Sequence, residues 1–460
     1  MGSISPLNLS SLLSALGSSS SGINVQAAVA QAIAAESGPL TQLEQQQALL
    51  QSQTGDINQI ENDITTLQTA LSALSQPVGA LTAMTTSSSN SSIVTASAES
   101  GTVAGNHVVV VNNLASTASW YSGEETNSSA TLPTGSFTLT VGSNAPITIN
   151  TGSGTSGDTL GDLATYINGL GAGVTASVVN DSAGSRLAIV SNSSGAASNF
   201  TISNATGLNF TEAVTGVDAS LTVDGIPIDS ASNTVTGAVT GLTLNLLSAS
   251  PGTEVNVAVA PDSSQISSAV TNFVNAYNTV IGDVNKEYTL GSNGAEGPLS
   301  GYPVLSMLQS QLLSTGAYTS GGNGVSTLAD LGITMNNDGT LTLDSSTLNS
   351  AIQNNFSAVQ NFFQGTASNG FASLLSGQLT NLTDPVSGAF TVDLQSISNE
   401  NSDLQTQINN FQTYLSNQTT LLTNEYNQAD ILLQQLPIEE QQINAELGNP
   451  TNNNSTSSGG

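Results

Sequence analysis

The side chains that most often carry out catalysis or hold a metal ion are scarce in this sequence. The chain of 460 residues has one histidine, His107, no cysteine, and two basic side chains, Arg186 and Lys286. His107 opens an apolar run, His107-Val108-Val109-Val110-Val111, which is typical of a strand. A catalytic histidine needs a nucleophile and an acid placed around it, and nothing near His107 in the sequence supports that role. We therefore do not expect His107 to be catalytic.

One segment resembles part of a calcium-binding loop. When Asn336-Asn337-Asp338-Gly339 is aligned with a twelve-residue calcium-binding loop, Thr334 and Ser345 fall at the first and twelfth positions. Calcium requires acidic ligands at these two positions. The same Asp-Gly pair lies between two runs of alternating apolar residues. That pattern predicts a β-hairpin, because glycine accepts the positive φ of the turn. We expect no bound metal and no cofactor.

The charge balance excludes several classes of protein. The chain has 32 Asp+Glu against 2 Lys+Arg, a formal net charge of −30. Nucleic acids and anionic lipids are bound through cations, so neither is an expected partner. No apolar run approaches the roughly 20 residues of a membrane span, so membrane insertion is not expected. Phosphate-loop, nucleophile-elbow and zinc-protease motifs are absent from the sequence. An enzyme such as a glycosidase is a distant alternative, because nothing places two carboxylates at the required separation.

With so little chemistry, the periodicity of the chain is more informative. From 43 to 82, apolar residues recur every seven positions, and a second set (Ile60, Leu67, Leu74, Leu81) lies three or four positions away. This spacing predicts a helix that packs along a partner helix. A preceding helix is predicted to begin near Asn24 and to break at Pro39. The heptad positions are Leu43, Leu50, Ile57, Ile64, Leu71 and Val78.

The C-terminal end repeats this design. A second set of heptad positions, three or four residues from the first, holds Leu404 and Phe411 but is interrupted by Gln418 and Glu425. The two polar residues indicate that part of this helix face is exposed in the monomer. Pro437 is predicted to break the helix and to leave a short helical segment after it. We expect the two terminal helices to pair, within a chain or between subunits; an ordinary bundle is the alternative. The heptad positions are Ile408, Leu415, Leu422, Ala429 and Leu436.

Between about 86 and 262 the apolar period changes to two, which predicts short strands separated by Gly, Asn, Asp and Pro. One helix, 159–168, interrupts them. Helices are predicted again at 263–284, 305–313 and 345–363. The predicted strands are 93–98, 107–112, 137–141, 146–150, 174–180, 186–191, 200–203, 220–224, 234–236, 242–247 and 254–259.

The order helix, β block, helix predicts an α+β multidomain fold, with N- and C-terminal coiled-coil or helical-bundle legs and an inserted β-rich head. The Ser/Gly-rich start and the Asn/Ser-rich tail are expected to have little order of their own. The predicted units are a flexible segment and leg helix (1–42), a helical stalk (43–85 plus 263–400), a β head domain (86–127 plus 217–262), an inserted β-rich domain (128–216), and a C-terminal leg helix with a disordered tail (401–460).

Four motifs in order resemble the FliD family of flagellar filament cap proteins, also called hook-associated protein 2. They are Gly22–Gln26 with Ala35–Leu40, Val223–Ile226 with Ser232–Val235 and Gly241–Leu244, Phe273–Asn278, and Leu328–Ile333 with Asp338–Asp344. Thr159–Ile189 also resembles a β insert that several flagellar axial proteins share. The resemblance covers nearly all of the chain. Its signature residues here are Asp224, Gly225, Asn233, Gly241, Asp338, Gly339 and Asp344.

The resemblance implies a non-enzymatic homo-oligomer, with a pentamer favoured, outside the cell at the flagellum tip. In such a cap the leg helices contact the filament end, and the β heads form a plate that retains exported flagellin and guides its polymerisation. Export would use the flagellar type III apparatus and a dedicated chaperone, without a cleaved signal peptide. The residues expected to make the leg contacts are Ile408, Phe411, Leu415 and Leu422, with Leu43, Leu50 and Ile57 as partners.

Two alternatives stay open: another flagellar axial or junction protein, and an extracellular adhesin or surface-layer protein. The Gly241 and Asp338–Asp344 signatures argue against flagellin, and heptads at both ends argue against an adhesin. The near absence of Lys and Arg departs from the family, so we expect apolar and amide-based leg contacts. We interpret it as adaptation to an acidic exterior, where protonation of carboxylates relieves the self-repulsion of the chain.

Overall fold

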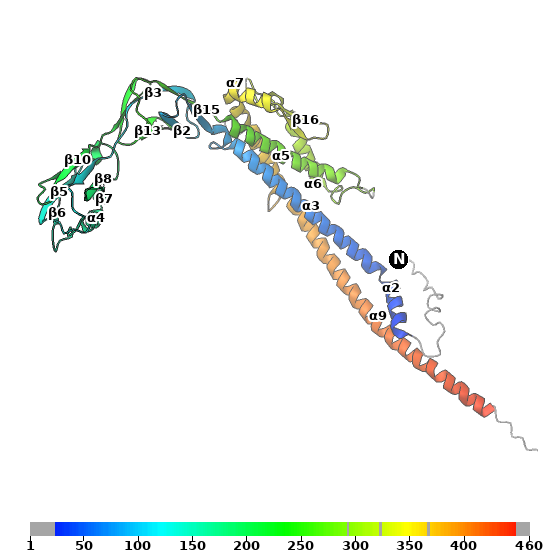
Figure 1. The fold of residues 1–460 in the computed structure, drawn as a ribbon. Coiled ribbons are helices and arrows are strands. Elements are labelled where there is room, and N and C mark those ends of the chain that lie inside the picture. The colour runs from blue at the N-terminus through cyan, green and yellow to red at the C-terminus, as the bar shows by residue number, and fades with distance from the viewer. Residues whose placement is uncertain (1–23, 292–293, 322–323, 366–368, 448–460) are drawn as a thin grey trace, which may run out of the picture.

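The protein is an elongated α+β molecule, as its sequence predicts. The computed structural model describes residues 24–291, 294–321, 324–365 and 369–447. The predictions for the Ser/Gly-rich start and for the tail lie outside these residues. A rod of terminal helices leads into a helical body, and two β blocks follow at the far end (Figure 1).

Three helices form the rod: α2 (Val25–Glu36), α3 (Gly38–Ser75) and α9 (Ala389–Leu447). The side chain of Asn24 caps α2 by accepting a hydrogen bond of 3.0 Å from the N–H of Ala27. Pro39 lies in the first turn of α3, where its missing N–H costs nothing, so the predicted break falls between α2 and α3. The helices α2 and α3 both pack along α9 (Figure 1).

Two details of the predicted rod are wrong. The helix α3 ends at Ser75, because Gln76 precedes Pro77 and takes an extended conformation; Val78 is therefore no seam residue and is 76% exposed. Pro437 does not break α9, which continues to Leu447. All residues from 431 to 440 are exposed, so water can satisfy the carbonyl that the proline leaves without a partner.

The body surrounds the upper half of the rod with four helices and a hairpin. They are α5 (Ser263–Tyr288), α6 (Pro303–Ser314), α7 (Ser345–Gln364), α8 (Phe371–Thr383), β16 (Ile333–Met335) and β17 (Leu341–Leu343). One apolar core joins these elements to α3 and to the first half of α9. The predicted Asp-Gly hairpin is confirmed, with Ile333 opposite Leu343. The helix α8 was not predicted.

The inner β block packs two antiparallel sheets around its own core. The first has the order β1 (Met84–Ser88), β15 (Val255–Pro261), β3 (Gly105–Asn113), β11 (Ala219–Val223), β12 (Ile226–Ser230). The second has the order β13 (Thr234–Val239), β14 (Leu242–Leu246), β2 (Val94–Ala98).

The outer β block has a separate core under the helix α4 (Leu160–Gly169). One sheet has the order β10 (Phe210–Val214), β4 (Ser119–Ser122), β8 (Ser185–Ser191), β7 (Val174–Asn180). The other has the order β6 (Ile147–Thr151), β5 (Gly135–Val141), β9 (Phe200–Ser203). Four strands of the two blocks, β1, β4, β10 and β12, were not predicted; of these, β12 carries a proline at a sheet edge.

Each β block is an insertion in the chain of the part before it. The chain therefore passes between neighbouring parts twice, and the leaving and returning segments lie next to each other; we call these paired segments the chain crossings. Between the body and the inner block, the N–H of Asp262 donates to the carbonyl of Ala83 at 2.9 Å. Between the inner and outer blocks, the N–H of Ser116 donates to the carbonyl of Val217 at 3.0 Å. The entering and leaving strands therefore lie side by side at both joints.

Candidate assembly surface on the terminal helices

The heptad residues of α3 lie inside the monomer. Leu50, Ile57, Ile64 and Leu71 are buried in the body core, and Leu43 is half-buried at the lower end of the rod. They face α5, α8 and α9, so the seam that the sequence predicts is filled by helices of the same chain. In this conformation only Leu43 of the predicted N-terminal contact residues reaches the surface.

The predicted contact residues of α9 divide into two groups. Ile408 and Leu415 are buried against the N-terminal helices, whereas Phe411 and Leu422 are half-buried. The polar contacts of this pairing involve amides and hydroxyls: Gln47 Nε2 donates to Gln405 Oε1 at 2.9 Å, and the Tyr414 hydroxyl donates to a Glu36 carboxylate oxygen at 3.4 Å. Neither of these two contacts involves a basic side chain.

The C-terminal part of α9 extends past α2 and continues alone (Figure 1). Every residue from Ile431 to Leu447 is exposed. We call residues 431–447 the free end of α9. Its carboxylates are not matched by any Lys or Arg in this stretch. Large apolar side chains exposed on a single helix are typical of a surface that binds another chain. The exposed apolar side chains here are Ile431, Leu432, Leu433, Leu436, Ile438, Ile443 and Leu447, of which Leu432 is 63% exposed.

The first group of signature residues shapes the inner β block. Asp224 and Gly225, both with positive φ, form the two-residue turn between β11 and β12, the geometry of a type I′ hairpin. The Asp224 carboxylate also accepts hydrogen bonds of 2.8 Å from the N–H of Val108 and from Nδ1 of His107. Those bonds lower the pKa of Asp224. The lone histidine of the chain therefore anchors a turn.

Asn233 and Gly241 support the same block. The side chain of Asn233 accepts from the N–H of Ala115 at 2.7 Å and donates to its carbonyl at 3.0 Å, as a neighbouring strand residue would. Gly241 has a φ of +76°, and a Cβ there would overlap the Thr102 hydroxyl.

The remaining signature residues hold the hairpin of the body. Asp338 accepts from the N–H and hydroxyl of Thr340 at 3.0 and 2.6 Å, and Gly339 supplies the positive φ of the turn. Asp344 caps α7, and its bonds to Ser346 and Thr347 lower its pKa to about 2. The sequence did not reveal that Asn278 of α5 pairs with both backbone groups of Leu341 in this hairpin.

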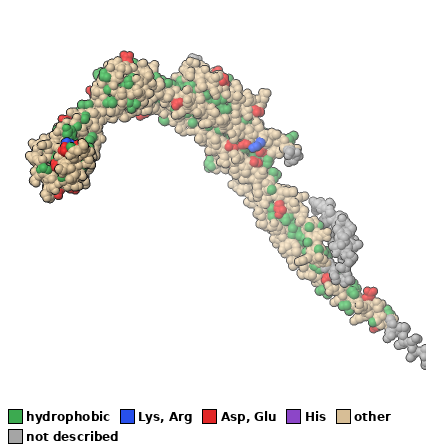
Figure 2. Space-filling model, viewed as in Figure 1, with side chains coloured by type: hydrophobic (Ala, Val, Ile, Leu, Met, Phe, Trp, Pro, Cys, Tyr) green, Lys and Arg blue, Asp and Glu red, His purple; other side chains and the backbone are tan. Residues whose placement is uncertain are grey.

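Charged side chains are sparse on the face that Figure 2 shows, and the two basic residues are already paired. Arg186 bonds Glu124 at 2.9 Å and Asp181 at 3.3 Å in the outer block, and Lys286 bonds Asp283 at 3.1 Å in the body. Within the described residues, no three His, Asp or Glu side chains form a group suited to a metal ion. No helix among them is long and apolar enough to cross a membrane.

A small group of carboxylates in the body has raised pKa values. Burial raises the pKa of Asp63 on α3, and the nearby Asp283 carboxylate adds to the effect. Burial also raises the pKa of Glu287, whose Oε2 accepts from the N–H of Leu299 at 2.7 Å. These side chains bind protons more readily in the folded chain than in the unfolded one.

A paired helical stalk with β blocks at one end and a free apolar helix at the other defines a stalk-and-head protein suited to assembly with other chains. Family models for the flagellar hook-associated protein 2 N-terminus and C-terminus match residues 21–118 and 216–437. A model for the flagellin hook IN motif matches residues 136–193 of the outer block. The chain belongs to the flagellar hook-associated protein 2 family, the flagellar cap proteins.

Named relatives agree with this assignment. The B-type flagellar hook-associated protein 2 of Pseudomonas aeruginosa is 27% identical over 359 residues, which cover 68% of this chain and 74% of that protein. The Escherichia coli flagellar hook-associated protein 2 is 26% identical over 369 residues, or 74% of this chain and 78% of that protein. A crystal structure of the D1-D2-D3 domains of the Escherichia coli flagellar cap protein FliD superposes with a TM-score of 0.60 at 26% identity, covering 75% of this chain and 99% of that one.

Proposed function

We propose that the chain caps the distal end of a bacterial flagellar filament, where it retains exported flagellin and promotes its addition to the filament. The observation that carries the proposal is the free end of α9. It presents large apolar side chains on a single helix. In the monomer these side chains are exposed to water, which is unfavourable. A filament end built from other chains offers the partner surface that these side chains need.

The proposal includes the assembly and the route to it. The working cap is a homo-oligomer, with a pentamer favoured, outside the cell at the flagellum tip. Flagellin, the filament tip, the flagellar type III export apparatus and a dedicated chaperone are its proposed partners. The five units 1–42, 43–85 plus 263–400, 86–127 plus 217–262, 128–216 and 401–460 are its proposed domains.

The proposed filament-contact residues differ in how far they are buried within one chain. Leu50, Ile57 and Ile408 are buried within one chain, so in this role they hold the leg together. Phe411 and Leu422 are half-buried, so part of each side chain stays accessible on the surface of α9. Mobile legs of this kind can release and rebind as each flagellin subunit is added, while the β heads stay joined.

A strain that lacks this gene tests the cap role directly. We expect electron microscopy to show hooks without filaments, and the growth medium to contain monomeric flagellin. Complementation with the doubly substituted Leu432→Ser/Leu436→Ser chain should restore filaments poorly. The matched control Gln441→Ser/Gln442→Ser changes exposed polar residues of the same free end and should restore them fully.

The outcome has clear alternatives. Normal filaments and no leaked flagellin in the deletion strain would remove the cap role and favour an adhesin. Full complementation by the Leu432/Leu436 variant would show that the cap works without these apolar side chains. Both substituted positions are exposed, so loss of folding is not expected to confuse the result.

A further inference from the structure

The free end of α9 continues a helix face that is buried nearer the body. Ile408 and Leu415 lie on heptad positions of α9 and are buried against the N-terminal helices. The same spacing of seven leads on to Leu436 and Ile443, which are exposed. Leu432 lies four positions before Leu436, so it shares that side of the helix and is exposed as well. The exposed face is therefore the unpaired continuation of an interface that forms within the chain.

The helix α2 covers the last buried part of this face and runs antiparallel to α9. Its final residue, Glu36, carries the carboxylate that bonds the Tyr414 hydroxyl. Its first residues lie toward the free end of α9 (Figure 1). The 12 residues of α2 place Asn24 about 18 Å further along the rod than Tyr414, which corresponds to about twelve residues of α9. The chain that precedes Asn24 therefore enters α2 close to the point where the exposed face begins.

Residues 1–23 lie outside the part of the chain that the structure describes, and their sequence carries an amphipathic pattern. Ser5-Pro6 is typical of a helix start and Gly17 of a helix end. The family model for the N-terminus matches only from residue 21, so this pattern precedes the part that the model describes. A helix this short is marginal in water unless another surface covers its apolar side. Four leucines recur at the spacing of one apolar helix face: Leu9, Leu12, Leu13 and Leu16.

We propose that residues 6–16 dock as a helix on the exposed face of the free end of α9 and cover it within the same chain. Continuing the direction of α2, this helix runs antiparallel to α9, with Leu16 toward Leu432 and Leu9 toward Ile443. Eleven helical residues are about 16 Å long, which matches the length from Leu432 to Ile443. The linker 17–23 must bridge about 8 Å along the rod, and seven extended residues reach about 23 Å.

Charge favours this occupant over a second copy of α9. The free end carries Glu439, Glu440 and Glu446 and no Lys or Arg. A second free end would bring the same three carboxylates, and like charges held close together repel. Residues 1–23 contain no Asp or Glu, so they add no such repulsion. Their covalent connection to α2 also keeps them near the free end at an effective concentration of about millimolar.

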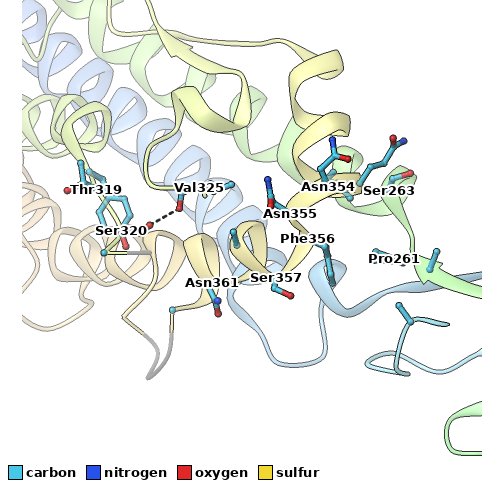
Figure 3. A pocket seen from close by; sticks show the side chains of 18 of the residues that line it. Pro261, Ser263, Thr319, Ser320, Val325, Asn354, Asn355, Phe356, Ser357 and Asn361 are labelled. Carbon is cyan, nitrogen blue, oxygen red and sulfur yellow. Dashed lines mark hydrogen bonds between the residues drawn. The ribbon is translucent and has the colours of Figure 1, made fainter. Parts of the chain in front are cut away.

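The hollow between α7 and the inner β block has no comparable need of a partner (Figure 3). Asn354, Asn355 and Ser357 of α7 line it, and these polar residues are exposed, so water can bond their side chains. Water offers no such compensation to the exposed leucines of the free end, because apolar surface is unfavourable in water. The demand for a cover is therefore specific to the free end.

Such a cover is local and weak. It opens without unfolding the body, so its loss leaves the global unfolding midpoint unchanged. Any partner that binds the free end must first displace residues 6–16, so the cover keeps the monomer from associating through this face until such a partner is present. The inference concerns the free chain in solution and does not rest on the cap role.

Intramolecular crosslinking of the purified full chain tests the proposal. The sequence has no cysteine, so Ser14→Cys/Gln435→Cys introduces two unique thiols, at positions that the proposed helix pair brings to the same level. We expect a short bis-maleimide to join the two thiols within one chain at micromolar protein. Peptide mass spectrometry identifies the product, and thermal melting verifies that the body is folded.

Two further variants in this background separate docking from the effect of the tether. Leu12→Ser/Leu13→Ser/Leu16→Ser keeps the length of the chain but removes the apolar face, and should lower the crosslinked fraction at least about threefold. It should also raise the fluorescence of an added apolar dye at least about twofold, because the free end is then uncovered. The matched control Ser10→Gln/Ser11→Gln changes the opposite, polar side of the same segment and should behave as the parent does.

The possible results are decisive. Equal crosslinking or equal dye fluorescence in the leucine variant and its parent would overturn the proposal, as would the absence of any crosslink. A product that joins two chains and increases with protein concentration would overturn it in favour of a second copy. None of these measurements involves a filament, so a failure of the cap role would leave their outcome unchanged.

Discussion

His107 and Asp224 lie 117 positions apart in the sequence, yet Nδ1 of His107 and Oδ2 of Asp224 are 2.8 Å apart in the fold. The bond connects strand β3 to the turn that follows β11. With Val108 donating to the other carboxylate oxygen, Asp224 holds two neighbouring strands in register. A histidine–aspartate pair of this kind is also found in catalytic triads, but here the other partner of the carboxylate is the backbone N–H of Val108 in strand β3.

Removal of the Asp224 carboxylate should destabilise the inner β block. We expect Asp224→Ala to lower the free energy of unfolding by about 1–2 kcal/mol, because two hydrogen bonds are lost and alanine is less suited to the positive φ of the turn. Asp224→Asn keeps an acceptor and the turn preference and should lose less. Urea denaturation followed by circular dichroism measures both, and an equal loss in the two variants would contradict this account.

Gly339 should not tolerate a side chain. Its φ is +82°, and a Cβ there would lie 2.8 Å from Cδ2 of Leu313. We expect Gly339→Ala to cost somewhat more than the about 1–2 kcal/mol of an alanine with left-handed backbone alone, because the exposed Leu313 side chain can move away but the buried Ile281, whose Cγ1 would be 3.3 Å from the Cβ, cannot easily do so. Gly252→Ala is the matched control, since Gly252 has a φ of +76° with open space around it. Equal unfolding midpoints for the two variants would show that contact with Leu313 is unimportant.

The buried and free parts of the terminal helices should respond differently to the loss of an apolar side chain. Ile57 is completely buried, so Ile57→Ala should lower the free energy of unfolding by about 2–5 kcal/mol. Leu432 is mostly exposed, so Leu432→Ala should change it by less than about 0.5 kcal/mol. Thermal melting compares them. A large loss in Leu432→Ala would mean that the free end of α9 is packed in the monomer.

Acidification should stabilise the protein before it destabilises it. Burial raises the folded-state pKa of Asp63, Glu287 and Asp393, so these groups favour the folded state increasingly as the pH falls through their pKa values. The self-repulsion of the net charge fades in the same range. We expect the melting midpoint to rise from pH 7 to about pH 4–5.

Below that range the direction should reverse. Hydrogen bonds lower the pKa values of Asp224, Asp330 and Asp344, so their stabilisation is present above the unfolded-state pKa near 4 and is lost as the pH falls toward about 2. Scanning calorimetry between pH 2 and 8 should therefore show a maximum. A midpoint that falls steadily from pH 7 to pH 4 would contradict the idea of adaptation to acid.

The elements with a strong internal period were predictable, and those defined by distant partners were not. The heptads of α3 predict most of its buried face, because helix geometry repeats along the chain, although Leu43 is only half-buried and Val78 lies beyond the helix. Asn233 and Asn278 satisfy backbone groups 118 and 63 positions away, and no spacing in the sequence encodes such a pairing. Pro437 misled the prediction because its effect depends on whether the freed carbonyl is buried, which is a property of the assembled fold.

The adjacent chain crossings at the two joints also bear on how such a protein can change over generations. Because the strands that enter and leave each β block lie side by side, a block can be lost, enlarged or replaced while the gap that must be closed stays short. The Ala83–Asp262 bond marks one such boundary and the Ser116–Val217 bond the other. Heads of very different size can therefore be grafted onto the same pair of legs, and a chimaera cut at these two pairs should fold without redesign of the stalk.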